Sequence, residues 1–126
     1  MLSGKTLIPT FPAYDLDRAS HFYEDKLGLH RAENQTPDGI LYESNGSSFM
    51  VYKSEAPRGG TTLAGFRVDD LDAEMRELRE RGIVFEEYDM PGLKTVDGVA
   101  EFGYGPAGRG AWFKDSEGNI LALTQM

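Results

Sequence analysis

The chain has 126 residues, of which 27% are charged, with no cysteine and a formal net charge of −8. These values are typical of a single globular domain that buries its own core, and they exclude disulfides and thiolate metal sites. The acidity opposes nucleic-acid binding, permits a cationic ligand and otherwise serves solubility, so we expect no nucleic-acid partner.

No apolar run in the sequence approaches the length of a membrane span, and residues 1–5 lack the long apolar stretch of a secretory signal. We therefore expect no membrane partner. With no disulfide framework and no sign of export, the sequence indicates a cytoplasmic location.

The first half of the chain predicts a strand, a helix and three further strands. The first strand covers residues 7–13, and Asp15 is placed to cap the helix that follows. An apolar stripe at helical spacing runs to Gly28 and consists of Leu16, Ala19, Phe22, Tyr23 and Leu27. The later strands are expected at 30–34, 40–43 and 47–53, joined by turns at 37–39 and at Asn45-Gly46.

The second half predicts the same series after a linker at 56–60 that is rich in glycine. A strand at 62–68 leads to a cap at Asp70 and to a helix that ends at Gly82. The apolar stripe of this helix consists of Leu71, Met75 and Leu78. A strand at 83–88 and a hairpin of 109–114 with 119–125 complete the series.

A short phrase is repeated between the halves, since Asp15-Leu16-Asp17 returns as Asp70-Leu71-Asp72. The halves are offset by 55 residues at these aspartates and by 72 at Gly46 and Gly118, so the second half carries an insertion of 17 residues. We expect one domain, 1–126, with a first module at 1–55 and a second at 61–126. The insertion, near 89–109, is predicted to be a long irregular loop of the kind that often serves function.

Three phrases stand in order along the chain, at residues 15–28, 66–72 and 113–119. Together they resemble the vicinal oxygen chelate superfamily, which includes glyoxalase I, bleomycin-resistance and fosfomycin-resistance proteins and extradiol dioxygenases. The likeness covers essentially the whole chain. The resemblance implies an α+β fold in which two tandem βαβββ modules form a curved, open mixed sheet around a cleft. It also implies a homodimer, which an unpaired sheet edge favours.

Metal-dependent members of that superfamily place His or Gln on two strands and Glu on two others. The resemblance assigns these four positions to Ile8, Met50, Leu63 and Ala122. None of these side chains has the oxygen or imidazole donors that Mg, Mn, Fe, Ni or Zn require. We therefore expect no metal and no cofactor.

Other candidates for chemistry are weak. His21 and His30, the only histidines, lie in separate elements and read as surface residues. The pair Glu86-Glu87 is typical of a solvated strand edge. The glycines at 103, 105 and 108 match the spacing of a dinucleotide-binding fingerprint, but no buried strand precedes them and no helix follows them in the predicted elements.

Strand alternation predicts which side chains line the cleft. Leu7, Phe11 and Ala13 should pack under a helix instead. The inward positions are Ile8, Thr10, Pro12, Ser48, Met50, Tyr52, Leu63, Gly65, Arg67, Ile120, Ala122 and Thr124. Trp112 joins them if Asp115 pairs with Asn119, and a tighter turn would place Phe113 there instead.

Of these positions, the candidate ligand-binding residues are Ile8, Thr10, Met50, Tyr52, Leu63, Arg67, Trp112, Ala122 and Thr124. This mostly apolar lining is typical of a small-molecule pocket, although the same residues could fill a closed core. Tyr88, Lys94 and Tyr104 could fold over the opening as a lid.

The leading hypothesis is a small-molecule binder without the family metal site, similar in kind to bleomycin-resistance proteins. Its ligand would be largely apolar or aromatic. The alternative is a glyoxalase-like lyase, isomerase or dioxygenase with an unrecognised metal or base, because a fold does not fix chemistry. A purely structural or regulatory protein is a third reading.

Overall fold

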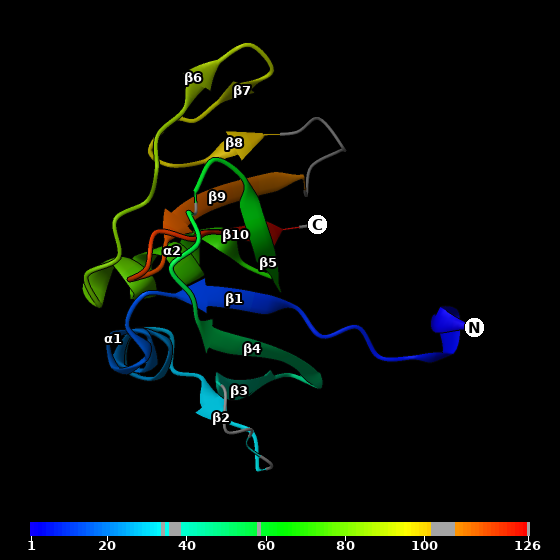
Figure 1. The fold of residues 1–126 in the computed structure, drawn as a ribbon. Helices are drawn as coiled ribbons and strands as arrows, with labels where there is room; N and C mark the ends of the chain where they lie inside the picture. Colours follow the sequence, from blue (N-terminus) through cyan, green and yellow to red (C-terminus); the bar gives the residue numbers. More distant parts are fainter. Residues whose placement is uncertain (34, 36–38, 58, 102–107, 126) are drawn as a thin grey trace. The chain divides into compact units, whose positions relative to one another are not determined.

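The structure is a computed structural model that describes residues 1–33, 35, 39–57, 59–101 and 108–125 (Figure 1). The chain forms two compact units, Met1–Pro57 and Arg58–Met126. Each unit contains one four-stranded mixed sheet with a helix packed on it. The fold class is therefore α+β, as the sequence predicted. No helix in the described part of the chain is both long and apolar enough to cross a membrane.

The first unit begins with a short 3-10 helix, η1 (Leu2–Gly4), and contains four strands and one interrupted helix. The strands are β1 (Thr10–Ala13), β2 (His30–Arg31), β3 (Gly39–Ser44) and β4 (Ser47–Lys53). They lie in the order β1-β4-β3-β2, with β1 parallel to β4 and the other pairs antiparallel. Asn45 and Gly46 both have positive φ, so the predicted Asn-Gly hairpin is confirmed.

The predicted first helix forms in two parts. Asp15 caps α1 (Leu16–His21) by accepting the backbone N–H of Arg18 at 3.0 Å. The chain then widens into one π-helical stretch, η2 (Phe22–Lys26), before Gly28 ends it at φ +70°. Phe22 and Tyr23, the first two residues of this stretch, are both buried.

An aromatic cluster forms the core of the first unit. Tyr23 is fully buried, and its ring lies 5.4–6.3 Å from four other rings. These rings belong to Phe11, Phe22, Tyr42 and Phe49. The face of the first sheet that carries Phe11, Tyr42 and Phe49 is therefore the face that packs on α1 and η2.

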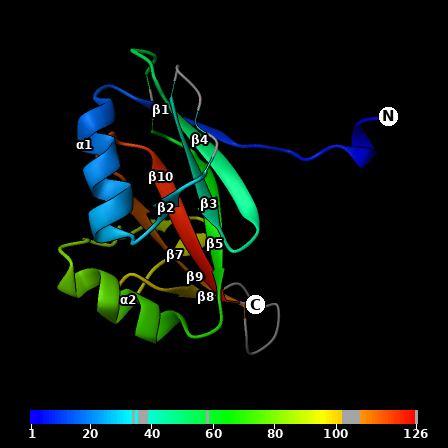
Figure 2. The same cartoon turned by 90° about the horizontal axis from the view of Figure 1, so that it is seen from below.

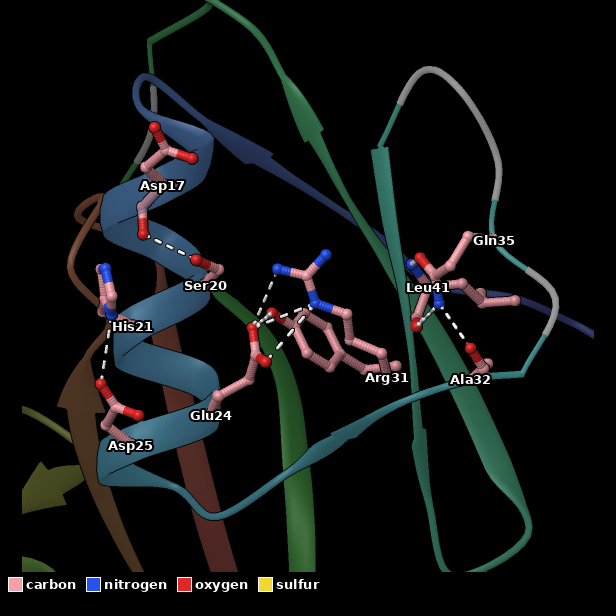
Figure 3. A network of polar contacts seen from close by, with 10 residues as sticks. Asp17, Ser20, His21, Glu24, Asp25, Arg31, Ala32, Gln35 and Leu41 are labelled. Carbon is pink, nitrogen blue, oxygen red and sulfur yellow. Dashed lines mark hydrogen bonds and ion pairs between the residues drawn. The ribbon is translucent and has the colours of Figure 1, made fainter.

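Polar contacts tie η2 to β2 and β3, and a second set joins Gln35 to the backbone of Ala32 and Leu41 (Figure 3). Arg31 donates to Glu24 through its guanidinium, and the Tyr42 hydroxyl donates to Glu24 Oε2 at 2.9 Å. The side chain of Gln35 binds the backbone of both Ala32 and Leu41 at 2.7–3.0 Å. These bonds attach Gln35 to the backbone next to β2 and within β3.

Stability should fall at alkaline pH because of Tyr42. Its burial, followed by the hydrogen bond to Glu24 and the charge of that residue, raises the pKa of Tyr42 far above the ordinary value of about 10. Above pH 10 the unfolded chain loses this proton while the folded protein keeps it, so the free energy of unfolding decreases. Urea unfolding at several pH values should show a steeper loss in the wild type than in Tyr42→Phe, by up to about 1 kcal/mol per pH unit. Equal slopes would contradict this assignment.

The second unit repeats the first sheet's order in β5 (Thr62–Val68), β10 (Ile120–Gln125), β9 (Arg109–Lys114) and β8 (Ala100–Glu101) (Figures 1 and 2). The outer strand β5 runs parallel to β10, and the other pairs are antiparallel. Asp70 caps α2 (Leu71–Glu80) through the backbone N–H of Ala73. Gly82 follows with φ +91°, so both ends of the helix were correctly predicted.

Alternate residues of β9 and β10 face α2. Gln125 accepts the backbone N–H of Leu71 at 2.8 Å, and Arg109 forms a bidentate ion pair with Asp72. Between them lie the buried side chains of Ala111, Phe113, Leu121 and Leu123. Because side chains alternate along a strand, Trp112, Ala122 and Thr124 point to the opposite side.

The prediction of a strand over 7–13 is wrong at its start. The register with β4 begins at Thr10, the Pro9 carbonyl still accepts the N–H of Met50 at 2.9 Å, and Leu7 is 87% exposed instead of packed under the helix. Pro9 has no backbone N–H to continue the ladder toward the N-terminus, which explains the shorter strand. Phe11 and Ala13 are buried as expected. The strand expected at 30–34 is likewise limited to β2, and residues 34 and 37–38 lie outside the described residues.

The segment 83–88 is also not a regular strand. It makes one bridge to β9 at Phe85 and one further hydrogen bond, from the backbone N–H of Glu86 to the carbonyl of Trp112. The backbone N–H and carbonyl of Tyr88 then bond to Thr95 instead of to β9. The insertion is correspondingly more regular than predicted. It holds the hairpin of β6 (Asp89–Met90) and β7 (Leu93–Lys94), a turn at 96–99 and β8.

Candidate functional site

We call the side of each sheet that points away from its own helix the far face. In the first unit, Thr10 lies opposite Met50 and Pro12 opposite Tyr52 in the pairing of β1 with β4. Met50 and Tyr52 are half-buried, whereas the alternate residues Phe49 and Val51 are buried on the helix side. The predicted assignment of sides is therefore correct for these strands.

The far face of the second sheet has a floor of small residues. Gly65, Ala122 and Trp112 form one row across β5, β10 and β9, and Arg67, Thr124 and Gly110 form the next. Gly65 lies so close to Ala122 that an added Cβ would be 3.4 Å from its methyl group and from its carbonyl oxygen. The large side chains therefore lie at the margins, with Trp112 on β9 and Arg67 on β5.

The position of Trp112 is set by the turn between β9 and β10. The backbone N–H of Asp115 donates to the carbonyl of Asn119 at 2.9 Å, which closes a turn of three intervening residues. The Asp115 carboxylate accepts the backbone N–H groups of Glu117 and Asn119 and the side-chain amide of Asn119. Of the two registers considered from sequence, this one places Trp112 opposite Ala122, so Phe113 faces α2.

Tyr88 extends the aromatic margin of this face. Its ring meets Trp112 edge to face, with ring centroids 5.7 Å apart. Burial and the Glu86 carboxylate raise the pKa of Tyr88. The contact brings one of the three residues predicted as a lid to the candidate site. Lys94 lies instead on β7, and Tyr104 lies outside the described residues.

Glu87 and Thr95 hold the backbone around Tyr88. The Thr95 hydroxyl donates to Glu87 Oε1 at 2.8 Å and accepts the backbone N–H of Tyr88 at 2.8 Å. The same carboxylate oxygen accepts the N–H of Gly98 at 2.5 Å. The sequence prediction of a solvated pair at 86–87 missed this role, since no local pattern joins Glu87 to residues eight and eleven positions later. Glu86, which is half-buried, does form an ion pair, with Lys114 at 3.4 Å.

Two predicted residues lie at irregular positions. Ile8 precedes β1 and is 47% exposed. Leu63 is the extra residue of an irregularity in the pairing of β5 with β10, where Ile120 is opposite Thr62 and Leu121 opposite Ala64. The structure brings together Thr10, Met50 and Tyr52 in the first unit, and Arg67, Trp112, Ala122 and Thr124 in the second.

A separate groove of about 1000 Å³ runs between α2 and the insertion, and the sequence did not predict it. Four cations and four anions line it: Arg76, Arg79, Lys94, Arg109, Asp72, Glu80, Asp97 and Glu101. Arg109 bridges to Asp72, and Arg79 donates to the carbonyl of Asp97 at 3.0 Å. Because the cations and anions are equal in number, the groove favours neither a positively nor a negatively charged ligand. Charged residues at helical spacing on α2 were the one signal for this groove.

The four positions that the resemblance assigns to metal ligands do not fit a hard cation. Ile8, Leu63 and Ala122 are hydrocarbon, and Met50 offers a soft thioether. Within the described residues no group of three His, Asp or Glu side chains is placed to hold a metal ion. His30 is exposed, and His21, also exposed, lies 3.2 Å from Asp25.

The repeated unit, a helix on a mixed sheet with its first strand parallel to its last, defines a glyoxalase-like fold. A profile of the Glyoxalase/Bleomycin resistance protein/Dioxygenase superfamily matches residues 9–123. The chain therefore belongs to this superfamily. A comparison with curated proteins gave no match.

Solved structures show the same fold at low sequence identity. TnmS3, an antibiotic binding protein from Streptomyces sp. CB03234, has a TM-score of 0.70 at 23% identity, covering 99% of this chain and 98% of its own. A glyoxalase family protein from Enterococcus faecalis has a TM-score of 0.73 at 19% identity, covering 99% and 100%. The fosfomycin resistance protein FosX from Listeria monocytogenes, solved with Mn(II) and a dihydroxypropylphosphonic acid, has a TM-score of 0.66 at 17% identity, covering 98% and 90%.

Proposed function

We propose that this protein binds a small, largely apolar or aromatic molecule without using a metal ion. The observation that carries the proposal is the aromatic margin of the second sheet, where Tyr88 meets Trp112 beside a floor of Gly65, Ala122 and Gly110. A flat ligand can approach such a floor closely and stack on the indole at its margin. A few polar groups beside an apolar wall are what orient a small ligand.

The far face of the first sheet supports the same function. Thr10 supplies a hydroxyl beside the thioether of Met50, and Tyr52 lies two residues further along β4. Methionine is flexible and polarisable, which suits a surface that adapts to an apolar ligand. TnmS3 is an antibiotic binding protein, which favours small-molecule binding over catalysis for this chain too, although the likeness to it establishes only the fold.

The proposal also covers the state in which the protein works. We place it in the cytoplasm as a homodimer, without a nucleic-acid or membrane partner. The absence of cysteine and the net charge of −8 support this setting. Each sheet ends in outer strands, β1 and β2 in one and β5 and β8 in the other, and pairing of such edges is one way in which two chains associate.

Binding can be followed through Trp112, because it is the only tryptophan in the chain. Titration with a panel of aromatic compounds should shift or quench its emission. Tyr88→Ala should weaken binding about tenfold, since a lost aromatic contact costs on the order of 1.4 kcal/mol including buried area. Tyr14→Ala removes a ring from the first unit and should leave affinity unchanged.

Metal analysis of freshly purified protein separates binding from the alternative of catalysis. We expect less than stoichiometric Ni, Zn, Mn and Fe. Stoichiometric metal together with turnover of the methylglyoxal–glutathione adduct would instead establish a glyoxalase-like enzyme. Equal affinities of the wild type and Tyr88→Ala for every ligand that binds would show that the aromatic margin of the second sheet is not part of the binding site.

A further inference from the structure

Arg67 is the unmatched charge on the far face of the second sheet. It is exposed on β5 and forms no ion pair with any described residue. The other cation on this face, Lys114, is paired with Glu86 at 3.4 Å. Among the described residues, the guanidinium of Arg67 is therefore left to bind a ligand, whereas Lys114 already has an anionic partner.

The strand register places Arg67 at the opposite margin of the floor from the aromatic pair. Arg67 and Trp112 are two strands apart and one far-face row apart. Spacings of about 4.8 Å between strands and 6.6 Å per two residues put their Cα atoms about 12 Å apart. Both side chains rise from one face, so one or two rings fit between guanidinium and indole.

The residues between these margins favour a flat molecule. Gly65, Ala122 and Gly110 offer at most a methyl group, so an aromatic plane can lie close to the backbone. Thr124, directly opposite Arg67 on β10, adds a hydroxyl beside the guanidinium. The polar groups thus gather at one end of the floor and the aromatic groups at the other.

We propose that the ligand is an aromatic carboxylate, whose ring stacks on Trp112 and Tyr88 and whose carboxylate pairs with Arg67. Guanidinium binds carboxylate through two parallel hydrogen bonds, a geometry that an ammonium group does not reproduce. This inference rests on the proposed function and names the class of ligand for it. It runs against the net charge of −8, which by itself attracts cations. Local pairing with Arg67 therefore decides the sign of the ligand's charge.

Three naphthalene probes of similar size test the proposal: naphthalene-2-carboxylate, its neutral carboxamide and 2-naphthylmethylammonium. Their affinities for the full chain are measured by calorimetry at 0.15 M salt, which screens the distant charges. We expect the carboxylate to bind about tenfold more tightly than the carboxamide, and the ammonium to bind most weakly. Arg67→Gln should abolish the advantage of the carboxylate, and Arg67→Lys should retain part of it.

Arg76→Gln is the matched control, because it makes the same change in net charge on α2. Arg76 is an exposed cation of the same unit without an ion pair to the described residues, and it should leave the order of the probes unchanged. Binding of all three probes with equal affinity, or an advantage that survives Arg67→Gln, would overturn the anionic assignment alone. Failure of the wild type to bind any probe would overturn the proposed function with it.

Discussion

Replacing Tyr23 by alanine is expected to lower the free energy of unfolding by about 3–5 kcal/mol, the range for removing a large buried ring. Tyr23 is fully buried, and it is the ring that connects the helical segment to the sheet in the first unit. Its loss separates Phe22 from Phe11, Tyr42 and Phe49 and leaves a cavity that the remaining rings fill only in part. Urea unfolding followed by far-UV circular dichroism gives the value.

Tyr23→Phe separates the ring from its hydroxyl. The phenylalanine ring keeps all four aromatic contacts, so this variant should lose about 1 kcal/mol at most, the ordinary value of one hydrogen bond. The comparison needs circular dichroism, because Trp112, the only tryptophan, belongs to the second unit. A loss in Tyr23→Phe as large as that in Tyr23→Ala would show that the hydroxyl, and not ring packing, holds the helix in place.

The sequence predicted this part of the fold well because the signals are local. Asp15 and Asp70 each accept a backbone N–H three residues later, which is a property of the first helical turn alone. Asn45-Gly46 requires positive φ at both positions, and few other dipeptides tolerate that. Alternation along β4 and β10 then assigned Met50 and Ala122 to the far faces without further information.

The errors lie where a distant partner decides the structure. The strand expected at 83–88 bends away because the backbone N–H of Tyr88 donates to the Thr95 hydroxyl, which itself donates to the Glu87 carboxylate. The spacing of apolar residues along the sequence does not predict such contacts. The same reason explains why the insertion was predicted to be irregular although Val96 pairs with Val99 around a turn with positive φ at Asp97 and Gly98. Leu63 was predicted at a regular position because the alternation of side chains along one strand does not reveal an irregular pairing with the next strand.

The candidate site was predictable in composition but not in arrangement. Alternation placed Arg67 and Thr124 on one face, and the register agrees with that assignment, whereas it left Trp112 and Phe113 as alternatives. The choice between Trp112 and Phe113 depended on the length of one turn, and a difference of one residue exchanges the two sides. The Asp115 carboxylate, which fixes that turn, is therefore as important to the site as any residue that would touch a ligand.

Asp115→Ala should consequently lower both the stability and the binding of aromatic ligands. Asp115 is 6% exposed, and its carboxylate accepts three N–H bonds at 2.8–2.9 Å from Glu117 and Asn119. Alanine leaves these donors without that acceptor, which should lower the free energy of unfolding by about 2–4 kcal/mol. Because the turn sets the register of Trp112 against Ala122, the tryptophan emission should also shift.

Two further variants make the test specific to the acceptor. Asp115→Asn keeps an oxygen for the two backbone donors that share Oδ1 and loses the bond to the Asn119 amide, so its loss should lie between those of the wild type and Asp115→Ala. Ser116→Ala removes a single hydroxyl bond to Glu117 in the same turn and should cost less than about 1 kcal/mol. If Asp115→Ala were as mild as Ser116→Ala and kept the wild-type emission, the turn would hold its register through the backbone alone. The position of Trp112 would then be set by β-sheet pairing, and the aromatic margin would not depend on a buried carboxylate.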